Sequence, residues 1–163
     1  MTLEDLEARF PTLAGEGTHH RDQRLGVVAC SEALVAARMG NYGVGAVLIE
    51  PNGEILERGR NTVFFPRFRS DLPAEMAVMT AFEEKHPAVV ARLLIAGVQT
   101  VKFLAHDDLG GMVNQRHSFP GAWRRLWQQR DFVQADVSEG LRQFALDVFL
   151  LNLESCRRRL LSR

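Results

Sequence analysis

The sequence predicts a layered α/β domain in which helices pack on a β-sheet. Stretches with apolar residues every three or four positions alternate along the chain with short, continuous apolar runs. The first pattern is typical of amphipathic helices and the second of buried strands, and their alternation is typical of layered α/β domains. The 163 residues fit one domain with one sizeable core, so we expect a single domain over 1–163, with 1–20 as an N-terminal extension.

Two helices are expected before the first strand. The N-terminal extension begins as a short helix and continues as a loop over residues 11–20. Residues 22–39 form a longer helix, which ends at the Gly40-Asn41 signal. Its apolar residues fall on one face, as helical spacing requires: Val27, Cys30 and Leu34.

A β-hairpin follows. Residues 44–49 are a continuous apolar run of strand length, which indicates a strand buried on both faces. Pro51-Asn52-Gly53 is a turn signal, because proline presets φ and Asn-Gly tolerates positive φ. Residues 55–60 then return as a second strand.

The rest of the chain continues the alternation. A loop over 61–69 is dense in aromatic and basic residues, and the next helix has Pro73 near its first position and Glu75 in its first turn. We expect Met76, Met79 and Phe82 to form the buried stripe of that helix. Later elements are a helix at 88–95, a strand at 100–105, a helix at 121–129, a strand at 131–137, and a long C-terminal helix capped by Ser138 that buries Leu141, Phe144, Ala145 and Val148.

Composition excludes several classes of function. Twenty basic residues balance 20 acidic ones, so the whole chain has no electrostatic reason to bind nucleic acid or an anionic membrane. No apolar run reaches the roughly 18 residues of a membrane span, and residues 1–10 lack a signal-peptide pattern. Two distant cysteines favour a cytoplasmic protein with structural thiols. The arginines at 157–159 are expected to form a solvated helix end.

Three short motifs stand in order along the chain: Val-Gly-Ala-Val at 44–47, Gly-Arg-Asn at 59–61 and Pro-Ala-Glu at 73–75. Together they resemble the cytidine/deoxycytidylate deaminase family, including its tRNA-adenosine/guanine branch. The first motif is similar to the family's first strand and the second to the end of its second strand. Pro-Ala-Glu at 73–75 is similar to its His-Ala-Glu helix start, and weaker likeness extends over roughly residues 22–155. The resemblance implies a three-layer α-β-α sandwich, with a mixed sheet of four to five strands and helices on both faces.

The family's zinc site is degenerate in this sequence. In the family, one His and two Cys hold a zinc ion that activates water, and a Glu that is not a ligand moves protons. The resemblance places Glu75 at that carboxylate but Pro73 at the His position. The cysteine positions lack thiols in either of two registers: Ala88 and Ala91, or Leu109 and Met112. We therefore expect no zinc and no other cofactor.

Candidate site residues follow from the same alignment of motifs. Glu75 is the candidate catalytic acid/base, and the Asn61 amide is a candidate contact to a base edge. The loop between them offers side chains that stack on a base or pair with a phosphate: Phe65, Arg67, Phe68 and Arg69.

Three functions remain open from the sequence. The first is a binding protein that holds a nucleobase-like or nucleotide-like small molecule, or a partner subunit, without hydrolytic deamination. The second is a zinc-independent enzyme in which Glu75 acts as general acid/base on a small heterocycle. The third is a structural or oligomerisation module. We expect a homodimer or a pairing with another deaminase-like subunit, and the apolar residues 88–95 are the candidate contact.

Overall fold

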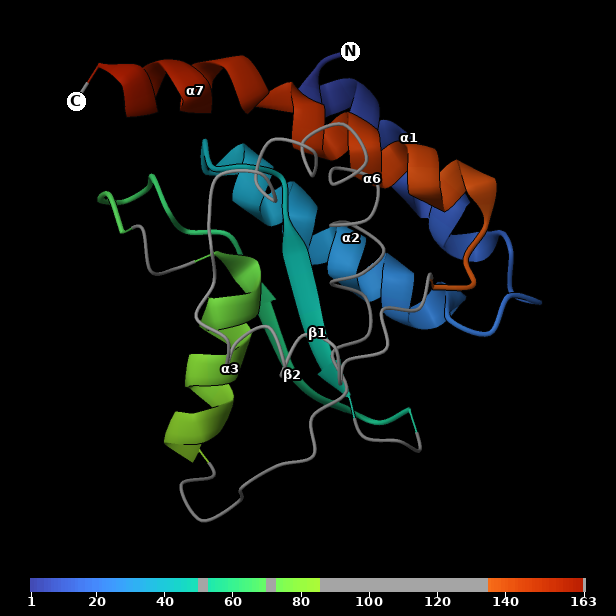
Figure 1. Cartoon of the computed structure of the whole chain (residues 1–163). Helices are drawn as coiled ribbons and strands as arrows, with labels where there is room; N and C mark the ends of the chain where they lie inside the picture. The colour runs from blue at the N-terminus through green and yellow to red at the C-terminus, as the bar shows by residue number, and fades with distance from the viewer. Residues whose placement is uncertain (50–52, 70–72, 86–134, 163) are drawn as a thin grey trace, which may run out of the picture.

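The computed structural model describes residues 1–49, 53–69, 73–85 and 135–162 (Figure 1). The predicted elements at 88–95, 100–105 and 121–129 lie outside these residues. Among the described helices, none is long and apolar enough to cross a membrane. The described elements, in chain order, are α1 (Leu3–Gly15), α2 (Gln23–Arg38), β1 (Gly45–Ile49), β2 (Ile55–Arg60), α3 (Ala74–Lys85), α6 (Glu139–Leu151) and α7 (Leu153–Leu161).

The predicted β-hairpin is confirmed. β1 and β2 pair antiparallel, with Gly45 opposite Arg60 and Ala46 opposite Gly59. All five residues of β1 are buried, as its continuous apolar run indicates. Gly53 has a φ of +86°, the left-handed conformation for which glycine is suited.

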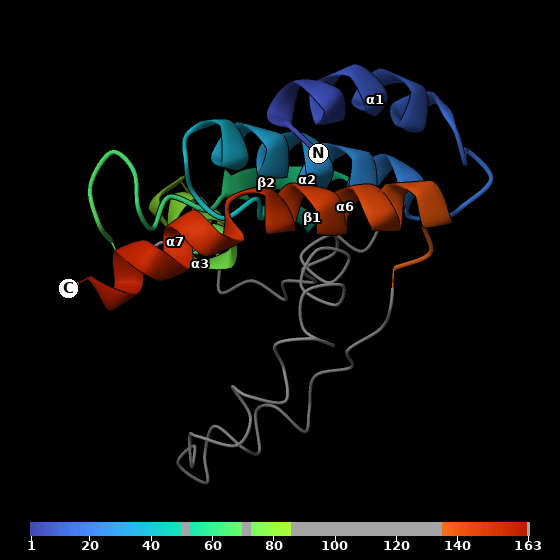
Figure 2. The same cartoon turned by 90° about the horizontal axis from the view of Figure 1, so that it is seen from above.

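Helices cover both faces of this hairpin (Figures 1 and 2). Val47 and Ile49 pack with Leu25 of α2 on one face, and Ala46 and Leu48 pack with α3 on the other. The alternation of β1 side chains therefore divides its contacts between the two helices.

The predicted mixed sheet of four to five strands in a three-layer sandwich is wrong. The described residues are mostly helical, and their one sheet has two antiparallel strands. The described part of the predicted last strand, residues 135–137, forms no strand. Its alternating apolar residues are buried, but its backbone binds Asp22: the Asp136 N–H donates to Asp22 Oδ2 at 2.8 Å, and the Asp136 carbonyl accepts from the Asp22 N–H at 2.9 Å. The alternating pattern of residues 135–137 therefore reflects the burial of Ala135 and Val137 and not strand pairing. The backbone groups of Asp136 bond to Asp22, the N-cap residue of α2.

The main apolar cluster lies between α1, α2 and α6, and we call it the helical core. The predicted faces of α2 and α6 are confirmed, since their apolar residues are buried in it or, for Val27, packed against it. Phe10 of α1 stacks on Phe144 of α6 with ring centroids 5.2 Å apart. The buried members are Leu6, Cys30, Ala33, Leu34, Ala37, Ala135, Val137, Leu141, Phe144, Ala145 and Val148.

Two helices differ in extent from the prediction. α1 continues through Pro11 to Gly15 where a loop was expected, because Phe10 and Leu13 both pack against the helical core. This packing outweighs the backbone bond that proline cannot donate. The C-terminal helix is divided at Asn152, whose Nδ2 donates to the carbonyls of Ala37 and Asn41 at 2.7 and 2.8 Å. The Ser138 cap is confirmed, since its side chain accepts from the Leu141 N–H.

The predicted stripe of α3 is partly wrong. Met76 is 42% exposed, Met79 is half-buried and only Phe82 is buried. The residues that face the sheet are Ala74, Val78 and Phe82, which are four apart and share one side of the helix. Met76 lies two residues from Ala74 and therefore points away.

Candidate functional site

The 61–69 loop begins with a buried asparagine. Asn61 is 4% exposed, and its N–H donates to the Val44 carbonyl at 2.9 Å. Its side-chain Oδ1 accepts from the Val63 N–H at 3.1 Å. Asn61 was predicted to contact a base, but its side-chain oxygen is already bonded within the turn that follows β2.

Asn41 holds the middle of the loop in place. Its side chain is fully buried, and its Oδ1 accepts from two consecutive N–H groups, Phe64 at 2.8 Å and Phe65 at 3.0 Å. Sequence reasoning used Asn41 only as a helix-ending signal and missed this role. The available signal was a polar residue between a helix and a fully apolar strand, where burial demands a hydrogen-bond partner.

Aromatic side chains pack beneath the loop. The Tyr42 ring lies 5.4 Å from Phe64 and 5.8 Å from Phe149 of α6, and Phe64 lies 5.8 Å from Phe68, measured between ring centroids. The Arg69 N–H donates to the Val63 carbonyl at 2.7 Å and closes the loop on itself. The loop is thus held by hydrogen bonds and by edge-on and tilted ring contacts.

The tip of the loop faces outward. Phe65 is 50% exposed, and Pro66 and Arg67 are exposed, whereas Phe64 is only 8% exposed. The Phe65–Pro66 peptide bond is cis. Of the predicted contact residues, Phe65 and Arg67 are thus available to a ligand, and Phe68 and Arg69 are half-buried.

Glu75 lies on the first turn of α3, half-buried, as predicted. Gly59 allows α3 to sit directly on β2: a Cβ at Gly59 would lie 2.8 Å from the Ala74 carbonyl oxygen and 2.8 Å from the Val78 nitrogen. The Glu75 turn and the end of β2, where the 61–69 loop starts, therefore lie next to each other (Figure 1).

Of the positions at which the resemblance implies zinc ligands, Pro73 is the one that the structure describes, and its tertiary amide nitrogen has no lone pair to donate. Ala88 and Ala91 lie outside the described residues. Within the described ranges, no three His, Cys, Asp or Glu residues gather as a metal site. Burial raises the pKa of Cys30 to about 12, so this thiol stays protonated in the helical core.

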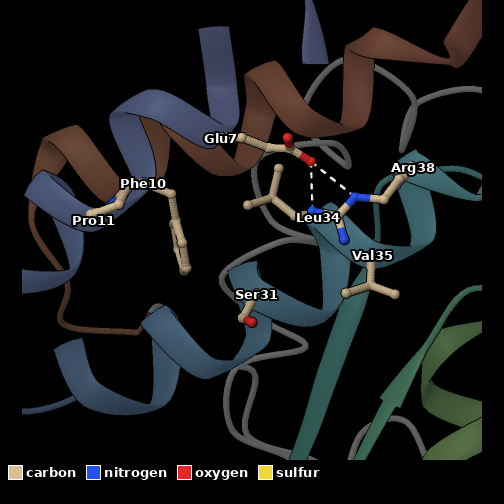
Figure 3. Close-up of a pocket in the computed structure, with 7 residues that line it drawn as sticks. All are labelled: Glu7, Phe10, Pro11, Ser31, Leu34, Val35 and Arg38. Carbon is tan, nitrogen blue, oxygen red and sulfur yellow. Dashed lines mark hydrogen bonds and ion pairs between the residues drawn. The ribbon is translucent and has the colours of Figure 1, made fainter. Parts of the chain in front are cut away.

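A groove lies between α1 and α2, and none of the predicted site residues lines it (Figure 3). It is an open groove of about 290 Å³. An ion pair crosses it, with Arg38 Nη2 2.6 Å from Glu7 Oε1. Its lining is otherwise mostly apolar and belongs to the seam between two packed helices: Glu7, Phe10, Pro11, Ser31, Leu34, Val35 and Arg38.

The arrangement defines a class of site, namely a fixed loop that carries an outward aromatic ring and an exposed basic side chain, and whose first residues lie next to the first turn of α3 with its Glu75. Such a site is suited to holding a flat ligand. No protein-family model, curated protein or solved structure matches the chain.

Proposed function

We propose that this protein binds a flat, nucleobase-like heterocycle at the 61–69 loop and does not deaminate it hydrolytically. The observation that carries the proposal is the exposed Phe65 ring on a backbone fixed by Asn41. Stacking of a base on an aromatic side chain contributes about 1–3 kcal/mol. Because the hydrogen bond to Asn41 already fixes the backbone at Phe65, little backbone entropy is lost when the ligand arrives.

The hydrogen bonds to Asn41 hold two neighbouring residues whose rings differ in exposure. Asn41 accepts from the N–H groups of Phe64 and Phe65 together, and the Phe64 ring turns inward onto Tyr42. The Phe65 ring is 50% exposed, and Arg67, two residues further along the loop, is exposed as well.

Binding is favoured over hydrolysis by the chemistry of the first turn of α3. Glu75 is present, but Pro73 stands where the resembling family has its zinc-binding histidine. General acid/base catalysis alone contributes about 10²–10⁴-fold, whereas attack on an aromatic amine requires an activated water. The cytoplasmic location and the homodimer expected from the sequence belong to the same proposal.

Thermal unfolding against nucleobases, nucleosides and related heterocycles tests the proposal. A ligand at about one hundred times its Kd adds about 2.7 kcal/mol to the free energy of unfolding. We expect a hit whose stabilisation falls strongly in Phe65→Ala and also weakens in Glu75→Gln. Leu150→Ala removes an apolar side chain of similar exposure, 48% against 50% for Phe65, from α6 and is expected to bind as wild type does.

Two results would overturn the proposal. One is that no compound stabilises the wild-type protein. The other is a hit that Phe65→Ala binds as tightly as wild type, which would place the ligand away from the loop.

A further inference from the structure

Helix α7 packs on the same short turn that holds the 61–69 loop. Cys156 Sγ lies 3.8 Å from the Gly40 carbonyl oxygen, and Arg159 Nη1 donates to that oxygen at 3.4 Å. The adjacent Asn41 binds the loop through its side chain and Asn152 through its carbonyl. One turn of three residues, 40–42, therefore joins α7 to the loop.

Both views of the molecule agree with these contacts. α7 and the 61–69 loop lie at the same end in Figure 1 and again in Figure 2. Tyr42 links them electrostatically as well: burial raises the pKa of its hydroxyl, and the charge of Arg157 opposes that rise. The Arg157 charge therefore acts on a ring that contacts Phe64.

This end of the protein concentrates positive charge although the chain as a whole is neutral. Arg157, Arg158 and Arg159 are all exposed on α7, and Arg67 is exposed on the loop. Glu154 pairs with Arg157 at 3.3 Å, but both side chains are exposed and such pairs contribute little. Arg158 Nε and Arg159 Nη1 each donate to a backbone carbonyl at 3.4 Å, that of Glu154 and that of Gly40, which leaves further N–H donors on both guanidinium groups for an anion.

We propose that the ligand of the 61–69 loop carries a phosphate, and that the α7 arginines bind it while the heterocycle stacks on Phe65. This inference rests on the proposed function and specifies its ligand as a nucleotide. Guanidinium groups match phosphate geometry through paired N–H donors. An aromatic ring that stacks on the base and basic side chains that bind the phosphate are the two components that recognise a nucleotide.

The test compares nucleosides, their 5′-monophosphates and inorganic phosphate by calorimetry on three proteins. These are wild type, the variant Arg157→Gln/Arg158→Gln/Arg159→Gln, and a matched control, Arg24→Gln/Arg38→Gln/Arg58→Gln, which removes the same charge from exposed sites elsewhere. We expect wild type and control to bind the monophosphate roughly tenfold or more tighter than the nucleoside. The α7 variant should lose this preference and bind the nucleoside as wild type does.

Each contrary outcome has a distinct meaning. Equal affinity for nucleoside and monophosphate, or a phosphate preference that survives in the α7 variant, overturns the inference and leaves the proposed function standing. Binding of a single-stranded oligonucleotide without any monophosphate binding also overturns it. Absence of all binding overturns both. If the triple variant does not fold, the double variant Arg157→Gln/Arg158→Gln is used in its place, because it keeps the Arg159 contact to Gly40.

Discussion

The helical core and the 61–69 loop are held by different kinds of interaction. The helical core combines apolar side chains from α1, α2 and α6, and each buried residue adds its share of area removed from water. The loop is held mainly by hydrogen bonds, and one amide, Asn41, accepts from two consecutive backbone N–H groups of it. Stability in the first region is spread over many apolar side chains, whereas in the second a few polar contacts carry a large share.

The largest expected effect is in the helical core. Phe144 is fully buried and stacks on Phe10, so Phe144→Ala is expected to lower the free energy of unfolding by about 3–5 kcal/mol. Urea unfolding followed by circular dichroism measures the change. Leu160→Ala, on the exposed side of α7, is the control and should stay within about 0.5 kcal/mol of wild type. A Phe144→Ala variant as stable as wild type would contradict the assignment of this cluster as the main core.

The next effect separates the two asparagines of the loop. Asn41→Ala leaves the N–H groups of Phe64 and Phe65 without their acceptor, and each buried donor left unpaired costs about 1–3 kcal/mol. Asn61→Ala removes one such bond, to Val63, and is expected to destabilise less. Urea unfolding of both variants gives the order. Equal losses, or a larger loss in Asn61→Ala, would show that Asn41 is not the main attachment of the loop.

Local patterns predicted the elements of both regions. The spacing of Cys30 and Leu34 identified the buried face of α2, Ser138 identified the start of α6, and the turn at Gly53 identified the hairpin. The aromatic and basic loop and its carboxylate neighbour were also visible as a cluster. Each of these signals lies within a few residues of the element that it predicts, so a single sequence is sufficient to predict these elements.

The remaining features depend on residues far apart in the chain. Asn41 binds Phe64 across 23 positions, and Asp136 binds Asp22 across 114. No local pattern states that residues 135–137 satisfy their backbone on a helix cap, so their alternation was taken as a strand. The local sequence also does not predict which of Phe64 and Phe65 is buried, because the buried ring is the one that contacts Tyr42.

The smallest expected effect concerns the charged seam between the start of α2 and the approach to α6. The hydrogen bond from the Arg21 side chain lowers the pKa of Asp22, and the Arg21 backbone N–H, with His20, lowers that of Asp136. Both carboxylates thus hold protons less tightly in the folded protein than in the unfolded chain. Their stabilising effect is complete above the unfolded pKa of about 3.9 and is lost as pH falls through the folded values.

We therefore expect the free energy of unfolding to fall as the pH is lowered from about 4, and to fall less steeply in Asp136→Asn. Asp136→Asn should also be slightly less stable than wild type at neutral pH, because it replaces the carboxylate that accepts from the Arg21 N–H at 3.0 Å and contacts His20 Nδ1 at 2.8 Å. Urea unfolding at a series of acidic pH values measures both. Glu4→Gln removes an exposed carboxylate from α1 and should keep the wild-type slope. If Asp136→Asn keeps it too, the charge of Asp136 does not stabilise the seam, and residue 136 contributes to it through its backbone bonds to Asp22 alone.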